Sequence, residues 1–368
     1  MGTKVNMRFT QLDGLRGISS LMIIFYHFEK MYTPEIFYNF FFIRQGQIFV
    51  DVFFIMSGFV IYYHYNTINS NYDFLKFIKK RFFRLYPLLF TTSIFFLIFY
   101  FFRDYLFNNG YSHLFNFNTS QLSNDLWDFL ETVLLTNSNL LLGNSIGVNS
   151  PSWSISAEII CYFIFGILTI YNKRPTVKVG LIIISSYFLI SFSDTYFATR
   201  DFGFLRGIIG FNYGAILCWI YNNYGNKIIN SKISHNNLFL ILTTLMFLVW
   251  MNLLNIDLIN KGAMILLTPI IISFLVFSII IYQKKLFLKN RIFQFFGNIS
   301  YSIYLNHLFI VIYFPKFAEL LNINLENTIN QLILMLLIII SSIFISYITY
   351  NLIEKYFYPS INKVQLNK

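Results

Sequence analysis

The chain has 368 residues, of which 56% are hydrophobic and only 12% are charged, and its net charge is +11. Several apolar runs approach or exceed the roughly 18 residues that a transmembrane helix needs, so a soluble globular protein is excluded. Its two cysteines, Cys161 and Cys218, lie in apolar runs without metal-ligand spacing. We therefore predict a polytopic membrane protein with packed cysteines and neither a disulfide framework nor a metal site.

The apolar runs predict about ten transmembrane helices in an all-α bundle that forms a single domain over residues 1–368. No small-residue cleavage site follows the first run, and Arg16 interrupts it, so we expect this helix to be retained. The expected helices cover residues 12–32, 46–65, 87–107, 151–171, 178–193, 204–222, 237–254, 263–282, 293–314 and 328–353.

The distribution of basic residues predicts the orientation of the bundle. With the N-terminus in the cytoplasm, the cytoplasmic segments hold 19 of the 27 lysines and arginines. This excess predicts that both termini are cytoplasmic, and it explains the net charge without a nucleic-acid partner. The longest outer connection, roughly 108–150, contains the apolar stretch DLWDFLETVLL, which we expect to lie on the outer interface or dip into it.

The first helix carries two ionisable side chains on one face. Arg16 and His27 are eleven residues apart, which places them on nearly the same helix face and roughly 16 Å apart along the axis. A central arginine in a membrane span costs roughly 2.5 to 3.5 kcal/mol and usually faces a bundle interior or a wet cavity. We interpret the pair as the axis of a functional site.

Three further titratable side chains, Asp51, Glu158 and His307, are expected at about the depth of His27, each on a different helix. Any one of them alone can be a satisfied packing residue, and Trp153 is more typical of an interface anchor. Their coincidence at one depth favours a shared site.

The segment FLKFIKKRFFRLYP, between the second and third expected helices, is basic and amphipathic. Its lysines fit a collar that extends toward anionic lipid. Arg81 and Arg84 lie on one face, and guanidinium groups suit phosphate. Together with Arg16 they predict a cationic cluster that receives a phosphate-bearing donor from the cytoplasm.

Five segments, in this order, resemble the membrane-bound acyltransferase 3 family, which includes O-antigen acetylases and other envelope polysaccharide acyltransferases. They are LDGLRG with Arg16 and His27, DVFFIMSGF at 51–59, RFFRLYP at 81–87, SWSISAE at 152–158 and GNISYSIYLNH at 297–307.

The resemblance implies an enzyme of the cell inner or plasma membrane that moves an acyl group, usually acetyl, from cytoplasmic acyl-CoA to a sugar hydroxyl across the membrane. The donor would be acyl-CoA, usually acetyl-CoA in such enzymes, with its phosphates on Arg16, Arg81 and Arg84. The acceptor would be a polysaccharide or glycolipid. The lipid bilayer and other polysaccharide synthesis proteins are the expected partners.

For this reaction we predict that His27 is the general base, since a neutral imidazole suits proton abstraction near pH 7. Asp51 or Glu158 would orient the imidazole. The side chains expected to bind the acceptor or the thioester oxyanion are Ser57, Trp153, Ser154 and His307. A covalent acyl-His27 intermediate stays open.

Two other functions fit the same buried charges. In a transporter or flippase for an envelope glycan or lipid, His27 would relay protons, although the sequence shows no recurring half-chain pattern. In a non-catalytic subunit, the charges would serve helix packing. The acceptor hydroxyl, the acyl group and the oligomeric state stay open.

Overall fold

The computed structural model describes residues 8–109, 122–139, 143, 145–231, 234, 237–282, 284 and 286–357. Lys4, most of the C-terminal tail and part of the 108–150 connection lie outside these ranges. Within the described ranges, nine helices are long and apolar enough to cross a membrane. The chain is therefore an all-α polytopic membrane protein, and the predicted fold class is confirmed.

Nine of the ten predicted spans match these helices. They are α4 (Phe49–Tyr65, extended by the short η2 at Gly46–Ile48), α5 (Asn71–Asn108), α7 (Ser152–Tyr171), α8 (Pro175–Phe192), α9 (Gly203–Ile229), α11 (Asn237–Asn255), α12 (Lys261–Ile281), α13 (Arg291–Leu320) and α14 (Thr328–Thr349, continued by η5 at Tyr350–Glu354 and α15 at Lys355–Phe357).

The tenth predicted span corresponds to α1, which covers Thr10–Tyr26 and has 17 residues. The expected end at residue 32 is wrong, because the helix stops at His27 and the chain turns through η1 (Lys30–Tyr32). Thr33 is extended, as is usual for a residue that precedes proline, and Pro34 cannot continue a helix. The short helices α2 (Glu35–Tyr38) and α3 (Phe41–Arg44) then lead to α4.

The predicted basic segment and the third span form one continuous helix. This helix, α5, has 38 residues and contains Pro87. At 1.5 Å per residue it is about 57 Å long, almost twice the roughly 30 Å hydrocarbon core of a bilayer, so its basic first part extends well beyond a membrane. Next to Pro87, the Tyr301 hydroxyl of α13 donates to the Leu85 carbonyl over 2.6 Å and holds α5 against α13.

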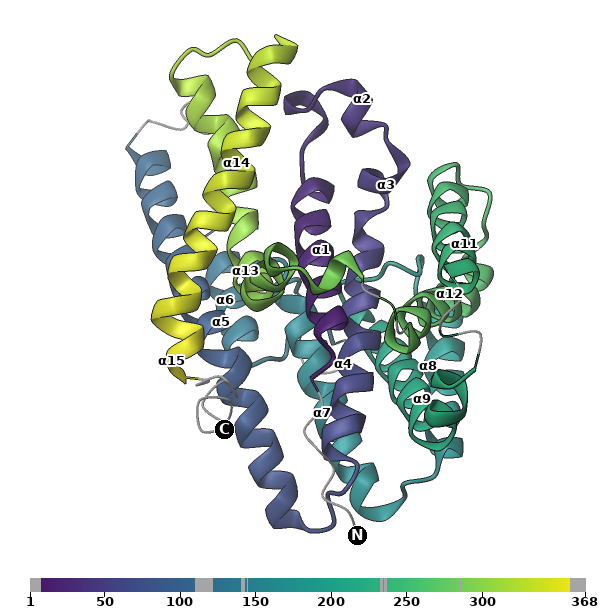
Figure 1. The fold of residues 1–368 in the computed structure, drawn as a ribbon. Coiled ribbons are helices and arrows are strands. Elements are labelled where there is room, and N and C mark those ends of the chain that lie inside the picture. Colours follow the sequence, from purple (N-terminus) through teal and green to yellow (C-terminus); the bar gives the residue numbers. More distant parts are fainter. Residues whose placement is uncertain are drawn as a thin grey trace.

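Helices α1 and α4 stand in the middle of the molecule, with α5, α13 and α14 on one side and α8, α9, α11 and α12 on the other (Figure 1). α1 packs along α13, and α4 packs along α9. In the most apolar part of α4, 72% of the residues are buried, against 28% in α14. By the same measure α9 and α13 are interior helices like α4, while α14, α11 and α8 face outward.

Glycines allow the interior helices to approach closely, as small residues do in membrane bundles. A Cβ atom on Gly58 of α4 would lie 1.9 Å from the Phe211 carbonyl oxygen of α9, and one on Gly17 of α1 would lie 2.8 Å from the backbone nitrogen of Gly297 in α13. Gly17 and Gly297 belong to the LDGLRG and GNISYS segments. These glycines bring the backbones into contact and thereby fix the spacing of the side chains beside them.

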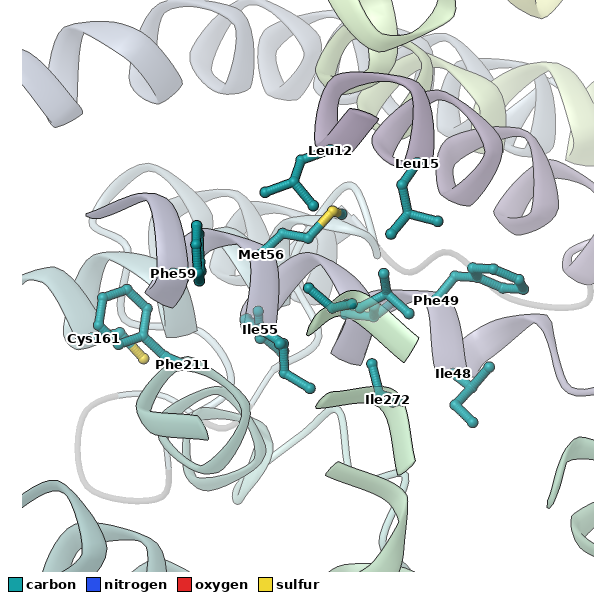
Figure 2. Packing of buried hydrophobic residues seen from close by; sticks show 14 of the residues in the cluster. Leu12, Leu15, Ile48, Phe49, Ile55, Met56, Phe59, Cys161, Phe211 and Ile272 are labelled. Atoms are coloured by element: carbon teal, nitrogen blue, oxygen red, sulfur yellow. The ribbon is translucent and has the colours of Figure 1, made fainter. Parts of the chain in front are cut away.

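The apolar core joins α1, α4, α7, α9 and α12. Figure 2 shows Leu12 and Leu15 of α1 facing Met56 of α4, with Cys161 and Phe211 packed beyond them. Both cysteines are buried and contribute their side chains to this core, which confirms their predicted packing role.

The apolar stretch of the long connection forms α6, Leu122–Val133, which packs against α5 and α7. It is amphipathic. Asp125 is buried in an ion pair with Arg103 of α5, whereas the Trp127 side chain is 62% exposed. An exposed apolar face beside a helix bundle is what an interfacial helix requires.

Candidate active site

Two histidines from α1 and α13 are in direct contact. His27 caps the C-terminal end of α1 and is half-buried, while His307 of α13 is fully buried. The Nδ1 atom of His27 lies 3.2 Å from Nε2 of His307, and the ring centroids are 5.0 Å apart. The sequence places these two side chains at a similar depth, and in the structure they form a pair.

The backbone contacts of the two rings assign their protons. The Nδ1 atom of His307 lies 3.1 Å from the Ile303 carbonyl oxygen, and Nδ1 of His27 lies 2.9 Å from the Ile23 carbonyl oxygen. Because a carbonyl oxygen only accepts, each Nδ1 carries the hydrogen in the neutral ring. Nε2 of His307 then accepts from Nδ1–H of His27, which the Ile23 carbonyl shares. In this arrangement, Nε2 of His27 keeps its lone pair and is free to accept a proton.

His27 lines a pocket of about 340 Å³ at the end of α1. The walls come from the last turn of α1 and from the chain between α1 and α4. They include the aromatic Tyr26, Phe28 and Tyr38 as well as the charged Glu29, Lys30 and Arg44. The pocket is large enough for a small polar substrate group and adjoins the proposed base.

Asp51 of α4 is engaged in a buried ion pair with Arg206 of α9. The guanidinium donates through Nε to Oδ1 over 2.8 Å and through Nη2 to Oδ2 over 2.7 Å, and both side chains are 1% exposed. The Tyr196 hydroxyl adds a third donor at 2.9 Å. Burial, followed by the nearby Asp51 carboxylate, raises the pKa of Tyr196 well above its usual value, so this hydroxyl stays protonated.

This ion pair changes the role that the sequence suggests for Asp51. The sequence predicts that Asp51 or Glu158 orients His27, but the described hydrogen bonds of His27 run to His307 and Ile23. The carboxylate of Asp51 instead accepts two hydrogen bonds from the guanidinium of Arg206. The sequence pattern did not identify Arg206 as this partner. An arginine inside the apolar run GFLRGIIG was the available signal, since a charge in a span needs a partner.

Glu158 of α7 lies in a different polar cluster. Its Oε1 atom accepts hydrogen bonds from the hydroxyls of Ser57 in α4 and Tyr162 in α7. Arg16 of α1 lies within electrostatic range of Glu158 and also of Arg84. The structure therefore groups Glu158 and Ser57 with the arginine end of α1 rather than with the histidine pair.

The arginines predicted to bind the donor differ in their partners. Arg84 of α5 forms an ion pair with Glu354, whose side chain is fully buried in the π-helical turn η5 and also accepts from Ser302 over 2.9 Å. Arg81 lies over the Tyr65 ring, 4.8 Å from its centroid. The structure shows no hydrogen bond or ion pair from Arg16 to any described residue. Glu354 was missed because the sequence pattern places it simply at the end of the last span.

Ser154 and Trp153, at the start of α7, are both buried. The Ser154 hydroxyl lies 2.8 Å from the Tyr304 hydroxyl of α13, and Tyr304 is a near neighbour of His307 with ring centroids 6.2 Å apart. The indole of Trp153 instead covers Arg206, whose guanidinium carbon lies 5.3 Å from the ring centroid. Ser154 thus approaches the histidine pair through Tyr304, and Trp153 encloses the Asp51 ion pair.

In the part of the chain that the structure describes, no three histidine, cysteine, aspartate or glutamate side chains lie close enough together to hold a metal ion.

Comparison with known proteins identifies the family of the chain. A sequence model of acyltransferase family 3, described as an acyltransferase domain, matches residues 9–351. A protein of Aquifex aeolicus (strain VF5), described as an uncharacterized protein, is 29% identical over 222 residues, which cover 59% of this chain and 89% of the relative. No solved structure matches the chain. Because the family match spans nearly the whole chain, this protein belongs to the membrane-bound acyltransferase 3 family.

Proposed function

We propose that the protein is an O-acyltransferase that moves an acyl group, most simply acetyl, from acyl-CoA to a hydroxyl of a cell-envelope or extracellular polysaccharide. The family match supports acyl transfer as the class of reaction. The observation that carries the proposal is the position of two polar groups on α1. The helix ends at the His27–His307 pair, and Arg16 lies about 16 Å away along the same helix.

In the proposed reaction, Nε2 of His27 takes the proton of the acceptor hydroxyl as its oxygen attacks the thioester carbonyl carbon. A new C–O bond forms, the C–S bond breaks, and the departing thiolate of CoA takes the proton back from His27. His307 acts by holding the ring of His27 through the Nδ1–H hydrogen bond, so it is a positioning residue. A covalent acyl-His27 intermediate is a variant of the same chemistry.

Arg16 is the proposed primary contact of the donor. Arg16 is half-buried as a residue, and its guanidinium has no hydrogen bond or ion pair within the described chain. Such a group suits a phosphate of acyl-CoA. The pantetheine arm of the donor would then run along α1 toward His27. Arg81 and Arg84 would add positive charge at the same end, although the ion pair with Glu354 offsets the charge of Arg84.

The basic-residue distribution supports a cytoplasmic position for the Arg16 end and an outer position for the pocket beside His27. The donor would approach from the cytoplasm and the glycan from the opposite side of the plasma membrane. In this proposal, one reaction centre near the outer end of α1 would serve two substrates that approach from opposite sides of the membrane.

The test is consumption of radiolabelled acetyl-CoA by purified protein in proteoliposomes, read as free CoA and as labelled glycan. We expect His27→Gln to lower the rate of consumption about 10²- to 10⁴-fold. Arg16→Gln should raise the KM for acetyl-CoA at least about tenfold, since a charged hydrogen bond contributes about 1.5–3 kcal/mol. Arg174→Gln, at an exposed arginine between α7 and α8, is the matched control and should behave as wild type.

Unchanged consumption in His27→Gln would refute the general base. If correctly folded wild type neither binds nor consumes acetyl-CoA, the donor is wrong. Movement of a glycan across the membrane without any donor would then favour the transporter.

A further inference from the structure

The pocket beside His27 carries two basic side chains on one aromatic ring. The Arg44 guanidinium donates through Nη1 to the Tyr38 hydroxyl over 2.7 Å and lies 4.6 Å from the centre of that ring. The Lys30 ammonium lies 6.0 Å from the same ring centre. All three residues line the pocket, so Tyr38 holds both cations at the edge of the space that His27 adjoins.

Neither cation is neutralised by an acid. Among the described residues, neither Lys30 nor Arg44 has a carboxylate within 4.0 Å. By contrast, three arginines of the interior, Arg84, Arg103 and Arg206, each have a carboxylate partner. The pocket wall contains one acid, Glu29, against the two bases Lys30 and Arg44, so the net charge of the lining is positive. Two adjacent cations without acidic partners attract an anion.

We propose that the acceptor is an anionic saccharide or polyol whose phosphate or carboxylate is bound by Lys30 and Arg44. The Arg44 fork retains free N–H groups for a planar oxyanion, and Lys30 contributes a point charge. The apolar face of a sugar ring packs on Tyr38, and a neighbouring hydroxyl reaches Nε2 of His27. This inference rests on the proposed function for the identity of the ligand as an acceptor, while the anion site itself does not depend on it.

Anionic lipid headgroups are a second source of the same phosphate chemistry. The exposed Met31, Ile36 and Phe40 lie in the same connection between α1 and α4, and such apolar side chains can contact a membrane surface. The location of both cations on the wall of the pocket that His27 lines favours the substrate over the lipid. The experiment separates these sources through the composition of the membrane.

Binding is measured on the full chain in nanodiscs of phosphatidylcholine alone, and again with phosphatidylglycerol. The probes are a trimer of galacturonic acid, a trimer of glycerol phosphate and an uncharged trimer of galactose. We expect at least one anionic trimer to bind about tenfold or more tightly than the galactose trimer, in both kinds of nanodisc.

The variant Lys30→Gln/Arg44→Gln should lose this preference. The swap Lys30→Arg/Arg44→Lys, which keeps both charges, should retain most of it, and this separates charge recognition from a structural role. Arg200→Gln, at an exposed arginine of the connection between α8 and α9, is the control and should keep the full preference.

Equal affinity of wild type for all three trimers, or a preference that survives Lys30→Gln/Arg44→Gln, would overturn the anion site. Loss of the preference when phosphatidylglycerol is present would assign the two cations to lipid instead. Acetyl-CoA consumption is read separately. Anion preference without acetyl-CoA consumption would refute the proposed function but support the anion site. Consumption that depends on His27, without anion preference, would support the proposed function but refute the anion site.

Discussion

Replacement of His307 tests how much the histidine pair contributes to the proposed reaction. In His307→Phe, the ring volume is kept and the acceptor for Nδ1–H of His27 is lost. That hydrogen bond is 3.2 Å long and shared with the Ile23 carbonyl at 2.9 Å, so the backbone still holds the same tautomer. The expected loss is therefore the net value of one neutral hydrogen bond, about 0.5–1.5 kcal/mol.

This free energy corresponds to a decrease in kcat of about 2- to 13-fold at 25 °C. Loss of the general base itself in His27→Gln should cost about 10²- to 10⁴-fold. His307→Gln supplies an amide oxygen that can accept from His27 and should recover part of the loss, with the KM for acetyl-CoA unchanged in both His307 variants.

The assay is the initial rate of acetyl-CoA consumption in proteoliposomes, with equal insertion and donor binding as controls. A loss in His307→Phe as large as that in His27→Gln would refute the positioning role and place His307 in the chemical step. Wild-type activity in His307→Phe would show that the Ile23 carbonyl suffices to orient the base.

Two further predictions concern the frame of the site. Arg206→Met leaves the Asp51 carboxylate buried and unpaired, so the free energy of unfolding should fall by about 3–5 kcal/mol. The double variant Asp51→Leu/Arg206→Met should recover most of that stability. The stability of both variants is measured by thermal unfolding in detergent. Gly58→Val forces a side chain against the α9 backbone, where a Cβ would already lie 1.9 Å from the Phe211 carbonyl oxygen, and should prevent recovery of folded monodisperse protein. The matched Gly180→Val should be recovered normally, because a Cβ there would meet no atom within 4 Å beyond its own stretch of helix. A folded Gly58→Val would contradict the close packing of α4 and α9.

The sequence predicts the membrane fold well because a span must satisfy its backbone internally and carry about 20 apolar residues. The same reasoning fails at the ends of spans. α1 ends at Tyr26 rather than at residue 32, because Pro34 and the turn at Lys30–Tyr32 override the apolar pattern. That error concerns the site directly, since it moves His27 from the interior of a helix to its end, where its ring lines a pocket.

Depth along a helix follows from residue spacing, so His27 and His307 are correctly expected near one another. Which face each helix presents is set by packing between helices, and that packing depends on close contacts such as Gly17 against Gly297. The partners of Asp51 and Arg84 are therefore invisible in the sequence. Each binds a charged residue more than a hundred positions away, Arg206 and Glu354 respectively.

Once these partners are known, the charges of the bundle separate into two kinds. Burying an ion costs several kcal/mol unless a partner and hydrogen bonds compensate, so the paired charges at Asp51 and Arg84 belong to the frame that fixes α4, α5 and α9. Within the described chain, Arg16 has neither an ion pair nor a hydrogen bond, and the hydrogen bonds of His27 use only Nδ1, so its Nε2 atom has none. These two groups lie about 16 Å apart along one helix, which is the separation that the proposed binding of two different substrates needs. A variant that gave Arg16 an acidic partner should therefore impair donor binding while it stabilised the fold, and the opposite result would place Arg16 in the frame.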